Sequence, residues 1–551
     1  MKIVTVAEMV AMEQATDAAG FSYDQMMAAA GGALARVIQD RAPFAGPILC
    51  LIGPGNNGGD GLVACARLQA AGAPAVPYIW RRKSGDDPLA VAVREAVWAE
   101  QDAGYMRLAD LVAQAGIIVD ALLGTGNTRP IEGSLAELLA AVRAGLDRRR
   151  QEQPVVVEPA WPRGRERALP TLIACDCPSG LNCDTGAIDP LALAADVTVT
   201  FALPKVGHFL QPGAFACGAL SVADIHIDRG LAPASAPDLL TPAEVARLLP
   251  ARPASGHKGT FGKALIVAGS THYPGAAAIA SLAAYRAGAG LVHLATSAAV
   301  GQLVAGQLPE PIHTVLPADL GSLTAAGVPI LAPLLPGHEA LLVGPGLGTD
   351  PATVELVPAL LLGQSATRHR GGILFASDTD APRPALPPLV VDADGLNAFG
   401  KLAGGPACLP PHSLLTPHPG EMARLTGLST PEVNANRWQV ARRFAAAWNQ
   451  IVVLKGAFTA IAHPDGRLAI SPFADAALAT AGSGDVLAGV LVALLAQGVD
   501  PWSAACAGVY LHALAGRLAA AALGPALLAT DIAHHLPQAL ARLHAVPPLP
   551  V

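Results

Sequence analysis

The 551-residue chain has few aromatic residues and no long apolar stretch. Phe, Trp and Tyr make up only 4% of the sequence, although hydrophobic residues make up 52%. Small side chains therefore carry much of the apolar content, which favours closely packed helices and strands. The longest apolar stretch, Val486 to Val499, is shorter than the roughly 20 residues that span a bilayer. The N-terminus, MKIVTVAEMVAMEQ, contains acidic residues and no signal-peptide core. We therefore expect a globular cytoplasmic protein with no membrane partner.

Positive charge and cysteine are also scarce. The net charge is -7, with 36 Lys and Arg against 43 Asp and Glu, so nothing indicates a nucleic-acid partner. Cys175, Cys177 and Cys183 form the closest group among eight scattered cysteines, without a histidine or second cysteine pair at zinc-like spacing. Such usage is typical of a reducing compartment. The expected partners are small molecules and further copies of this chain, as a homo-oligomer.

Short apolar runs alternate with Ala- and Leu-rich helical stretches, which predicts parallel sheets covered by helices on both faces. Strands are expected at residues 48–52, 117–119, 172–175, 197–201, 264–268, 291–295, 341–343, 389–391 and 451–454. The linker at 228–245 is rich in Pro, Ala and Ser and separates two sets of strands. We therefore predict two three-layer αβα domains, residues 1–235 and 236–551. Residues 147–168 and 377–388 are expected to be loop insertions.

The first candidate site follows the first expected strand, where residues 53–61 read GPGNNGGDG. This stretch contains G-x-G-x-x-G, which by itself is a weak dinucleotide-binding signal. Asn56, Asn57 and Asp60 add oxygen-bearing side chains before a helix expected at 61–71. Glycine-exposed amides at a helix N-terminus attract phosphate, and clustered oxygen atoms attract a hard cation. An ordinary polar turn is the alternative.

Two further strand ends carry an aspartate and a glycine loop. Asp120 precedes the G-T-G of residues 124–126, and Asp176 precedes the P-S-G of residues 178–180. Each aspartate alone is equally consistent with a helix cap or a turn. The carboxyl ends of parallel strands line one crevice, where ligands bind. Taken with the first loop, these strand ends predict a single site.

These motifs together resemble the NAD(P)H-hydrate epimerase family over most of residues 1–230, with T-F-A-L-P-K at 200–205 as a further match. The resemblance implies a Rossmann-like domain in which Asp176 is the catalytic acid and base. Inverting C6 of the hydrated nicotinamide ring requires proton transfer near the C6 hydroxyl and the ring nitrogen. The implied K⁺ ligands are Asn57, Asp120 and Ser179. The implied substrate-binding residues are Asn56, Asn57, Gly58, Gly59, Asp60, Gly124, Thr125, Gly126, Asn127, Thr128, Arg129, Pro130 and Asp176.

One segment departs from this family. Residues 27–31 read M-A-A-A-G, where the family usually has M-E-N-A-G. Ala28 and Ala29 therefore remove any polar contact made by the missing Glu and Asn, and any part these play in subunit packing. A non-catalytic binding scaffold is the alternative function for this domain.

A second candidate site lies in the C-terminal half. GHKGTFGKA at 256–264 has the wrong glycine spacing and lacks the hydroxyl of a Walker loop. A-G-S-G-D at 481–485 opens a long apolar helix, whose free N–H groups can hold a transferring phosphoryl group while Asp485 accepts the proton of the attacking hydroxyl. Alone, Asp485 would be a favourable first-turn acid. Four more motifs follow apolar strands and open onto the same crevice, at 344–348, 392–397, 416–421 and 454–457.

This set resembles the ribokinase-like domain of ADP/ATP-dependent NAD(P)H-hydrate dehydratases over roughly residues 240–540. The motifs include G-P-G-L-G, D-A-D-G-L-N, T-P-H-P-G-E and A-G-S-G-D. The resemblance implies that Asp485 is the catalytic base. The implied hydrate contacts are Ala276, Gly346, His418 and Asp485, and the implied nucleotide contacts are Lys455, Gly456, Ala457 and Gly484. It also implies Mg²⁺ at the phosphates, and an Ala-rich, bacterial-type composition favours ADP as co-substrate.

The sequence thus predicts a bifunctional nicotinamide cofactor repair enzyme. One half would interconvert the R and S hydrates of NADH and NADPH (NADHX and NADPHX). The other would dehydrate the S form with ADP, releasing NAD(P)H, AMP and phosphate. The alternative is a vitamin-precursor kinase of the hydroxymethylpyrimidine or hydroxyethylthiazole type, carrying a Rossmann-like binding domain.

Overall fold

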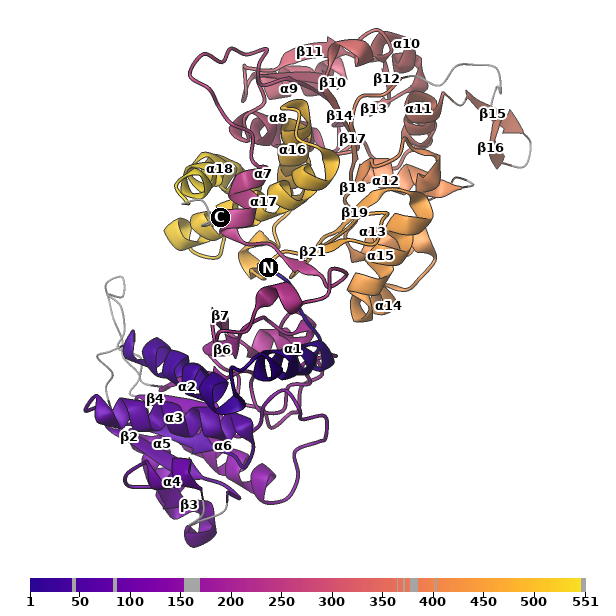
Figure 1. The fold of residues 1–551 in the computed structure, drawn as a ribbon. Coiled ribbons are helices and arrows are strands. Elements are labelled where there is room, and N and C mark those ends of the chain that lie inside the picture. Colours follow the sequence, from indigo (N-terminus) through magenta and orange to yellow (C-terminus); the bar gives the residue numbers. More distant parts are fainter. Residues whose placement is uncertain are drawn as a thin grey trace. The chain divides into compact units, whose positions relative to one another are not determined.

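The protein consists of two compact units, Met1–Ala236 (unit 1) and Pro237–Val551 (unit 2) (Figure 1). The structure is a computed structural model. It describes residues 1–41, 46–82, 87–152, 169–363, 365–369, 372–376, 385–400, 402 and 404–546, with backbone alone for 365–369 and 372–376.

Unit 1 is built on a seven-stranded sheet in the order β3-β2-β1-β4-β5-β6-β7, and every pairing in it is parallel. The strand order reverses between β1 and β4, and ligands bind at such reversal points in open α/β sheets. The strands are β1 (Ile48–Ile52), β2 (Ala75–Ile79), β3 (Val97–Trp98), β4 (Ile117–Ala121), β5 (Thr171–Cys175), β6 (Val197–Phe201) and β7 (Ala219–Ala223).

Helices cover both faces of this sheet. All residues of β1 are buried, and successive side chains point to opposite faces. Ile48 and Ile52 pack with residues of the first three helices, whereas Leu49 and Leu51 pack with residues of the fifth and sixth. The helices are α1 (Val6–Ala18), α2 (Tyr23–Gln39), α3 (Asn56–Ala70), α4 (Pro88–Val91), α5 (Met106–Gln114) and α6 (Ser134–Gln151). Short 3₁₀ helices are η1 (Ala99–Gln101), η2 (Ala103–Tyr105), η3 (Val206–His208), η4 (Gly213–Ala216) and η5 (Arg229–Leu231).

Unit 2 contains a ten-stranded sheet in the order β11-β10-β9-β14-β17-β18-β19-β20-β21-β8. The pairings from β11 to β19 are parallel, and β20 runs antiparallel to both of its neighbours. The strands are β8 (Asp238–Leu239), β9 (Lys263–Val267), β10 (Leu291–Thr296), β11 (Ile312–Val315), β14 (Ala340–Val343), β17 (Leu389–Val391), β18 (Leu414–Leu415), β19 (Ile451–Leu454), β20 (Ala460–Ala462) and β21 (Leu468–Ile470). Two small hairpins pair β12 (Ala318–Asp319) with β13 (Ser322–Leu323) and β15 (Ser365–His369) with β16 (Gly372–Ala376).

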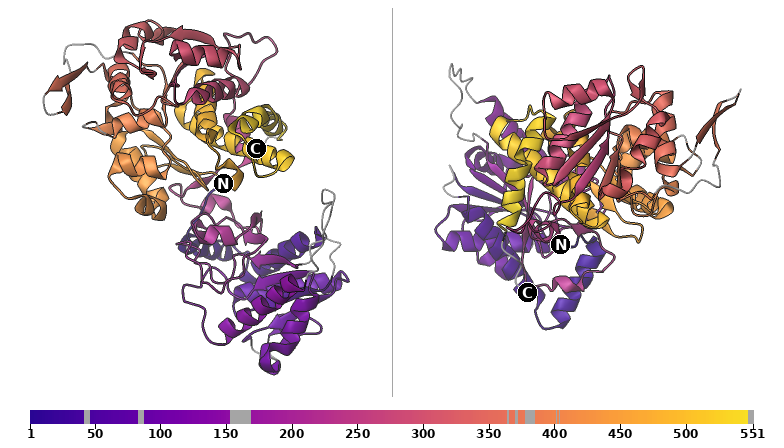
Figure 2. Two further views of the ribbon diagram at one scale, coloured as in Figure 1. Left: turned by 180° about the vertical axis from the view of Figure 1, so that it is seen from behind. Right: turned by 90° about the horizontal axis from the view of Figure 1, so that it is seen from above.

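The helices of unit 2 also lie on both faces of its sheet, as the second view of Figure 2 shows. One face carries a large Ala-, Leu- and Val-rich core formed with helices α7 (Pro242–Leu248), α8 (Pro274–Arg286), α16 (Ser483–Ala496), α17 (Pro501–Leu523) and α18 (Ala529–His544). The remaining helices are α9 (Ala298–Ala305), α10 (Val328–Leu331), α11 (Pro351–Leu362), α12 (Asp394–Phe399), α13 (Pro419–Thr426), α14 (Thr430–Ala435) and α15 (Arg437–Trp448). The 3₁₀ helices are η6 (Ala325–Gly327), η7 (Leu335–Gly337), η8 (Gly405–Cys408) and η9 (Ala476–Leu478).

One helix in the described part of the chain, α17, is long and apolar enough to cross a membrane by composition alone. The longest apolar stretch of the sequence, Val486–Val499, lies mostly in the shorter apolar helix Ser483–Ala496. In the structure 67% of the apolar window of α17 is buried, and Ala505, Leu511 and Ala515 belong to the unit 2 core. Its apolar character is therefore explained by packing inside the unit.

The predicted fold class is confirmed, since both units are α/β, with a parallel sheet in unit 1 and a mixed, mainly parallel sheet in unit 2. All nine expected strands form, each within two residues of its predicted bounds. At the end of the linker, Thr241 and Glu244 form a capping box at the start of α7.

Two local predictions were wrong. Helix α3 begins at Asn56 and not at Gly61. This first turn packs so closely on the preceding loop that position 58 must be glycine, since a Cβ there would lie 2.0 Å from the Gly53 carbonyl oxygen. The expected insertion at 147–168 begins as helix, since α6 continues to Gln151. Its remaining part from 153, and residues 377–384 of the other insertion, lie outside the described residues.

Candidate active sites

Unit 1 contains a cavity of about 580 Å³ at the carboxyl ends of β1 and β4. Its walls come from the start of α3, the loop after β4, the strand end at Asp176, and helices α1 and α2. Nine residues expected to bind substrate line it, namely Asn56, Asn57, Asp60, Gly124, Thr125, Gly126, Asn127, Arg129 and Asp176. The structure therefore brings together three loops, the first and last of which are more than 100 residues apart in the sequence.

Four of the expected substrate residues do not line this cavity: Gly58, Gly59, Thr128 and Pro130. The two glycines serve packing, since a Cβ at Gly59 would lie 2.7 Å from the Met27 sulfur. Met27 lines the cavity, whereas Ala28 and Ala29 do not. The departure from the family motif at these two alanines thus lies behind the cavity wall.

The three expected K⁺ ligands lie together, and one of them, Asn57, lines this cavity. Ser179 Oγ donates to Asp120 Oδ1 at 2.6 Å, and Ser179 N donates to Asp120 Oδ2 at 2.8 Å. Asn57 Nδ2 donates to the Leu123 carbonyl at 2.9 Å, while the Leu123 amide donates to Ser179 Oγ at 2.9 Å. Asn57 Oδ1 is buried and has no hydrogen-bond partner among the described residues.

This set has the chemistry of a hard-cation site. Asp120 and Ser179 are 3% and 0% exposed, and burial raises the pKa of Asp120 despite its bonds from Ser179. An orphaned amide oxygen, a buried carboxylate and a hydroxyl are oxygen ligands of the kind that such cations prefer. The residues present therefore fit K⁺.

Asp176 lies at the turn after β5 in a left-handed backbone conformation, with φ of 61°, which is costly for a residue other than glycine. Its Oδ1 accepts hydrogen bonds from Lys205 Nζ at 2.6 Å and Thr200 Oγ1 at 2.8 Å. His208 Nε2 donates to the Asp176 carbonyl at 3.1 Å. A strained turn is thus held in place from both its side chain and its backbone.

The pKa values of the carboxyl groups around this cavity are shifted in opposite directions. Burial would raise the pKa of Asp176, but the Lys205 ammonium and its hydrogen bond outweigh burial and leave this pKa below its usual value. Burial and the neighbouring Asp176 hold the pKa of Asp60 well above its usual range. Burial also raises the pKa of Glu13. Neighbouring carboxyls whose pKa values are shifted apart, as those of Asp176 and Asp60 are here, are typical of acid–base sites.

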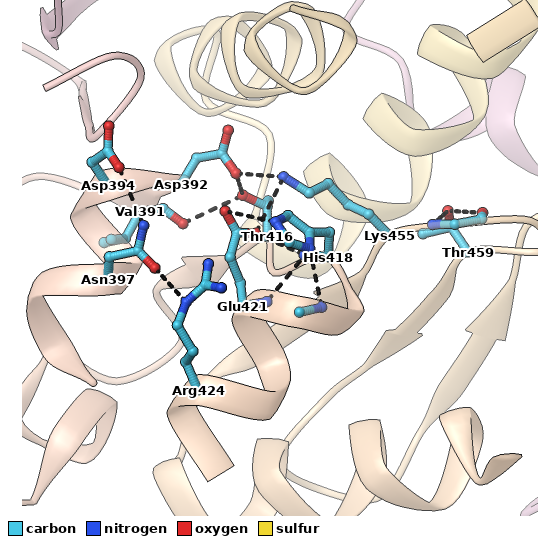
Figure 3. A network of polar contacts seen from close by, with 12 residues as sticks. Val391, Asp392, Asp394, Asn397, Thr416, His418, Glu421, Arg424, Lys455 and Thr459 are labelled. Carbon is cyan, nitrogen blue, oxygen red and sulfur yellow. Dashed lines mark hydrogen bonds and ion pairs between the residues drawn. The ribbon is translucent and has the colours of Figure 1, made fainter. Parts of the chain in front are cut away.

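The site in unit 2 is centred on a partly buried lysine (Figure 3). Lys455 Nζ donates to Asp392 Oδ1 at 2.7 Å, and Thr416 Oγ1 donates to the same oxygen at 2.6 Å. Glu421 Oε2 lies 3.8 Å from Lys455 Nζ. Lys455 comes from the end of β19, Thr416 from the end of β18 and Asp392 from the end of β17, so the parallel sheet assembles the cluster.

A second polar network borders a cavity of about 500 Å³. Asp394 accepts from the Gly348 amide at 2.8 Å and from Asn397 Nδ2 at 3.2 Å. Arg424 Nε donates to Asn397 Oδ1 at 2.9 Å, and all four residues line the cavity. His418 caps α13, because its Nδ1 accepts from the Gly420 amide at 3.0 Å. Burial lowers the pKa of His418.

Asp485 lies in the first turn of α16, as expected. Burial, with Asp392 nearby, raises its pKa to about 7. Gly484 lies beside the lysine cluster, since a Cβ there would lie 3.4 Å from Lys455 Nζ. Asp485 therefore adjoins the Lys455–Asp392 pair at the N-terminus of a helix, where anions bind favourably.

The other residues expected in the dehydratase site lie on two segments, one around Gly346 and one at the loop from Lys455 to Ala457. Gly346 opposes Ala276, since a Cβ on Gly346 would lie 2.7 Å from that of Ala276. The loop from Lys455 to Ala457 is held by Arg437, whose Nη2 donates to the carbonyls of Leu454 and Lys455, each at 2.9 Å. Burial lowers the pKa of Arg437 to about 10.

Sequence reasoning assigned no role to several residues of these sites. In unit 1 these are Glu13, Thr200 and Lys205; in unit 2 they are Asp392, Asn397, Thr416, Glu421, Arg424 and Arg437. Lys205 and Asp392 stand in the motifs T-F-A-L-P-K and D-A-D-G-L-N. A lysine or carboxylate that follows an expected strand could therefore have indicated a role in the site. Arg437 gave none, because an arginine within a helix is ordinary surface chemistry.

Each unit has a polar site at the carboxyl ends of its parallel strands, which defines a two-domain α/β enzyme with one candidate active site per domain. Residues 23–207 match the family model described as "YjeF-related protein N-terminus", and residues 264–538 match the model described as "NAD(P)H-hydrate dehydratase". The solved ADP/ATP-dependent NAD(P)H-hydrate dehydratase from Bacillus subtilis, co-crystallised with ATP/Mg2+, covers 56% of this chain and 98% of its own, with 32% identity and a TM-score of 0.45.

Two relatives match over nearly the whole chain. The bifunctional NAD(P)H-hydrate repair enzyme Nnr of Moorella thermoacetica is 37% identical over 90% of this chain and 88% of its own. That of Thermofilum pendens is 34% identical over 98% and 97%. The chain belongs to the family of bifunctional NAD(P)H-hydrate repair enzymes. It is an NAD(P)H-hydrate epimerase and an ADP/ATP-dependent NAD(P)H-hydrate dehydratase. The predicted function is thereby confirmed, and the vitamin-kinase alternative is wrong.

Proposed function

We propose that unit 1 epimerises the R and S hydrates and that unit 2 dehydrates the S hydrate with a nucleotide. Each unit carries a polar site at the carboxyl ends of its parallel strands, and the dehydratase family match lies wholly inside unit 2. Only one epimer is then phosphorylated, so the first reaction keeps the second supplied.

In unit 1, Asp176 exchanges a proton with the C6 hydroxyl of the hydrate. The observation that carries this role is its position: a carboxylate kept ionised by Lys205 faces a cavity large enough for a nucleotide ring. The helix start at Asn56–Asp60 and the loop Gly124–Pro130 bind the rest of the dinucleotide, whose phosphates suit exposed amides at a helix N-terminus.

Asn57, Asp120 and Ser179 hold K⁺ beside the substrate loops. The buried, unpartnered Asn57 Oδ1 supports this assignment, because such an oxygen loses its hydration without replacement unless a donor or cation meets it. A bound K⁺ would supply positive charge next to the dinucleotide.

In unit 2, Asp485 accepts the proton of the C6 hydroxyl as that oxygen attacks the terminal phosphoryl group. The amides at the start of α16, including that of Gly484, face the phosphates. Lys455, Gly456 and Ala457 contact the nucleotide, and Ala276, Gly346 and His418 contact the hydrate. Phosphate then leaves C6 and a proton is lost from C5 to water, so that the C5=C6 double bond of the dihydronicotinamide forms. A pKa of about 7 at Asp485 suits a base that acts near neutral pH.

We propose Mg²⁺ at the phosphates of unit 2, on the side where the Asp392 carboxylate lies near Asp485. Such a site supplies the charge neutralisation that phosphoryl transfer requires. ADP is the proposed co-substrate, with AMP and phosphate as products. Rates measured with ADP and ATP at equal concentration test this preference.

The proposed compartment is the cytoplasm, since all eight cysteines are free thiols, and the proposed assembly is a homo-oligomer. Light scattering of the purified chain tests the assembly.

The two reactions are separable in one assay. A mixture of R- and S-NADHX is incubated with the chain, ADP and Mg²⁺, and NADH absorbance is followed. Wild type is expected to convert both forms to NADH. Asp176→Ala should convert the S form and then slow to the rate at which the R form epimerises spontaneously. Asp485→Ala should form no NADH. If Asp176→Ala instead matches wild type on the R form, unit 1 does not use Asp176 as proposed.

A further inference from the structure

Lys205 is 1% exposed, although it borders the unit 1 cavity. A buried ammonium is costly unless each of its three N–H groups is satisfied. Lys205 Nζ lies 2.6 Å from Asp176 Oδ1, 3.0 Å from Thr200 Oγ1 and 3.2 Å from the Phe201 carbonyl. All three donors are therefore used within the protein. The ammonium is placed to orient Asp176 and not to bind the substrate itself.

The donors that reach the Asp176 side chain converge on one oxygen atom. Lys205 Nζ, Thr200 Oγ1 and the Phe201 amide, at 3.4 Å, all donate to Oδ1. No hydrogen bond from the described residues reaches Oδ2. Since Asp176 lines the cavity, Oδ2 is the carboxylate atom left for a substrate proton.

The segment that carries Lys205 also holds the Asp176 backbone. The Lys205 amide donates to His208 Nδ1 at 3.1 Å, and His208 Nε2 donates to the Asp176 carbonyl at 3.1 Å. Asp176 has the strained φ of 61°, a conformation that persists only where its surroundings impose it. One short segment thus fixes both the backbone and one carboxylate oxygen of the same residue.

We infer that Lys205 is a positioning residue of the epimerase: with Thr200 it occupies Oδ1 of Asp176, so that Oδ2 alone exchanges a proton with the C6 hydroxyl of the hydrate. This inference rests on the proposed role of Asp176. Oδ2 takes the hydroxyl proton as the C6–N1 bond breaks and C6=O forms. The electron pair of that bond goes to the ring nitrogen, which takes a proton from water. Ring closure on the opposite face of C6 reverses both transfers and gives the other epimer.

Lys205 also determines the pH range in which this base works. The charged and titratable groups around Asp176 are Lys205, His208, Glu13, Asp60, Cys175 and Cys177. Without Lys205, burial and the two nearby carboxyls would all raise the pKa of Asp176. The loss of epimerase activity on acidification should then begin at a higher pH.

The test compares Lys205→Met with Lys205→Arg in the full chain at fixed K⁺ concentration. Epimerisation is measured without ADP by chromatographic separation of R- and S-NADHX, with the spontaneous rate subtracted. For Lys205→Met we expect kcat to fall roughly tenfold to a hundredfold at neutral pH and KM to stay within about threefold. The acid limb of the profile of kcat against pH, where activity is lost on acidification, should move up by about one pH unit or more. Lys205→Arg keeps the charge and should retain the acid limb of wild type.

Strand β6 offers a matched control. Thr200 and Thr198 are both fully buried and lie on one face of the strand, but Thr198 Oγ1 donates to the Cys217 carbonyl and not to Asp176. Thr200→Val should lower epimerase kcat roughly threefold to tenfold, whereas Thr198→Val should leave it unchanged. Equal losses in the two variants would mean that general packing, and not contact with Asp176, explains the effect.

The outcomes separate this inference from the proposed function. If Asp176→Asn retains the wild-type epimerisation rate, Asp176 is not the acid and base, and the proposed function of unit 1 fails. If Asp176→Asn is inactive but Lys205→Met has the kcat and acid limb of wild type, the role of Lys205 is overturned. A Lys205→Met loss that is equal at every pH, and is not reduced in Lys205→Arg, also overturns it. Dehydration of S-NADHX with ADP checks in each variant that unit 2 is intact.

Discussion

The two units hold an aspartate in the same way and use it differently. In unit 1, Lys205 and Thr200 converge on Oδ1 of Asp176; in unit 2, Lys455 and Thr416 converge on Oδ1 of Asp392 (Figure 3). In both, the aspartate follows a parallel strand, and an unusual backbone angle lies at or next to it, with φ of 50° at Ala393 after Asp392. The same cluster therefore arises twice from the geometry of a strand end.

The two sites differ in which carboxyl group is proposed to act as the base. Asp176 is itself the proposed base of unit 1, and its lysine lowers its pKa. In unit 2 the proposed base is Asp485, which has no such lysine bond and whose pKa burial raises to about 7, with Asp392 adding to the effect. A lysine-held carboxylate is ionised over a wide pH range, whereas an unpaired buried carboxyl titrates near neutrality. Five experiments test how far this contrast holds.

The largest expected effect comes from removing each base in turn. Asp485→Asn should lower the rate of NADH formation from S-NADHX by roughly 10²- to 10⁴-fold and leave epimerisation unchanged. Asp176→Asn should do the reverse. Stopped assays on each purified epimer, with wild type alongside, measure both rates. A loss of both activities in either variant would contradict a division of labour between the units.

The next effect is on stability. Lys455→Met should cost roughly 3–5 kcal/mol, since Lys455 pairs with the buried carboxylates of Asp392 and Glu421 and its removal leaves them without a counter-charge. Urea unfolding of the unit 2 transition measures this cost. Thr416→Val removes only a hydroxyl from the same Asp392 oxygen and should cost about 1–3 kcal/mol. Similar costs for the two variants would show that the lysine charge adds little.

The pH dependence should separate the two halves. Asp485 acts as a base only when ionised, so a pKa of about 7 predicts that kcat/KM for S-NADHX falls about tenfold from pH 8 to pH 6. The pKa of Asp176 is below its usual value, so epimerase activity should change less than about twofold over this range. Activity profiles from pH 5 to pH 9, corrected for the spontaneous reactions, measure both. Coincident profiles would remove the contrast between the two carboxyls.

The same pKa values have opposite effects on stability. The folded-state pKa of Asp485 is raised, so its contribution to stability is fully present below the unfolded pKa and is lost as pH rises through about 7. Asp485→Asn should therefore stabilise the protein at pH 8 relative to wild type, by up to about 4 kcal/mol, and by much less at pH 5. The folded-state pKa of Asp176 is lowered, so its contribution is present above the unfolded pKa and is lost on acidification. Thermal unfolding at the two pH values measures the Asp485 effect.

The smallest expected effect is that of the cation. Replacing K⁺ with tetramethylammonium should lower epimerisation roughly tenfold and leave dehydration of S-NADHX unchanged, because the proposed ligands all lie in unit 1. Asn57→Ala should abolish the difference between the two cations, since it removes the orphaned Oδ1. An epimerase rate independent of the cation would argue that Asn57, Asp120 and Ser179 serve packing alone.

Much of the fold could be predicted from residue order. Strands such as Ile48–Ile52 and Val197–Phe201 were located correctly because short apolar runs bounded by glycine and polar residues occur in few other settings. The start of α3 was not, since Asn and Gly favour turns locally. Only the tertiary structure shows that the helix extends through this stretch, with Gly58 packed closely on the Gly53 carbonyl.

Sequence by itself determined which strand ends carry reactive groups, because Asp120, Asp176, Lys455 and Asp485 stand in short motifs readable along the chain. Tertiary structure decided what those groups do. The partners of Asp176 lie 24 and 29 residues away, and Lys455 lies 63 residues from Asp392, so no local pattern shows which carboxylate a lysine meets. Ionisation depends on burial and on charges a few ångströms distant, and those distances exist only once the sheet has brought its strand ends together.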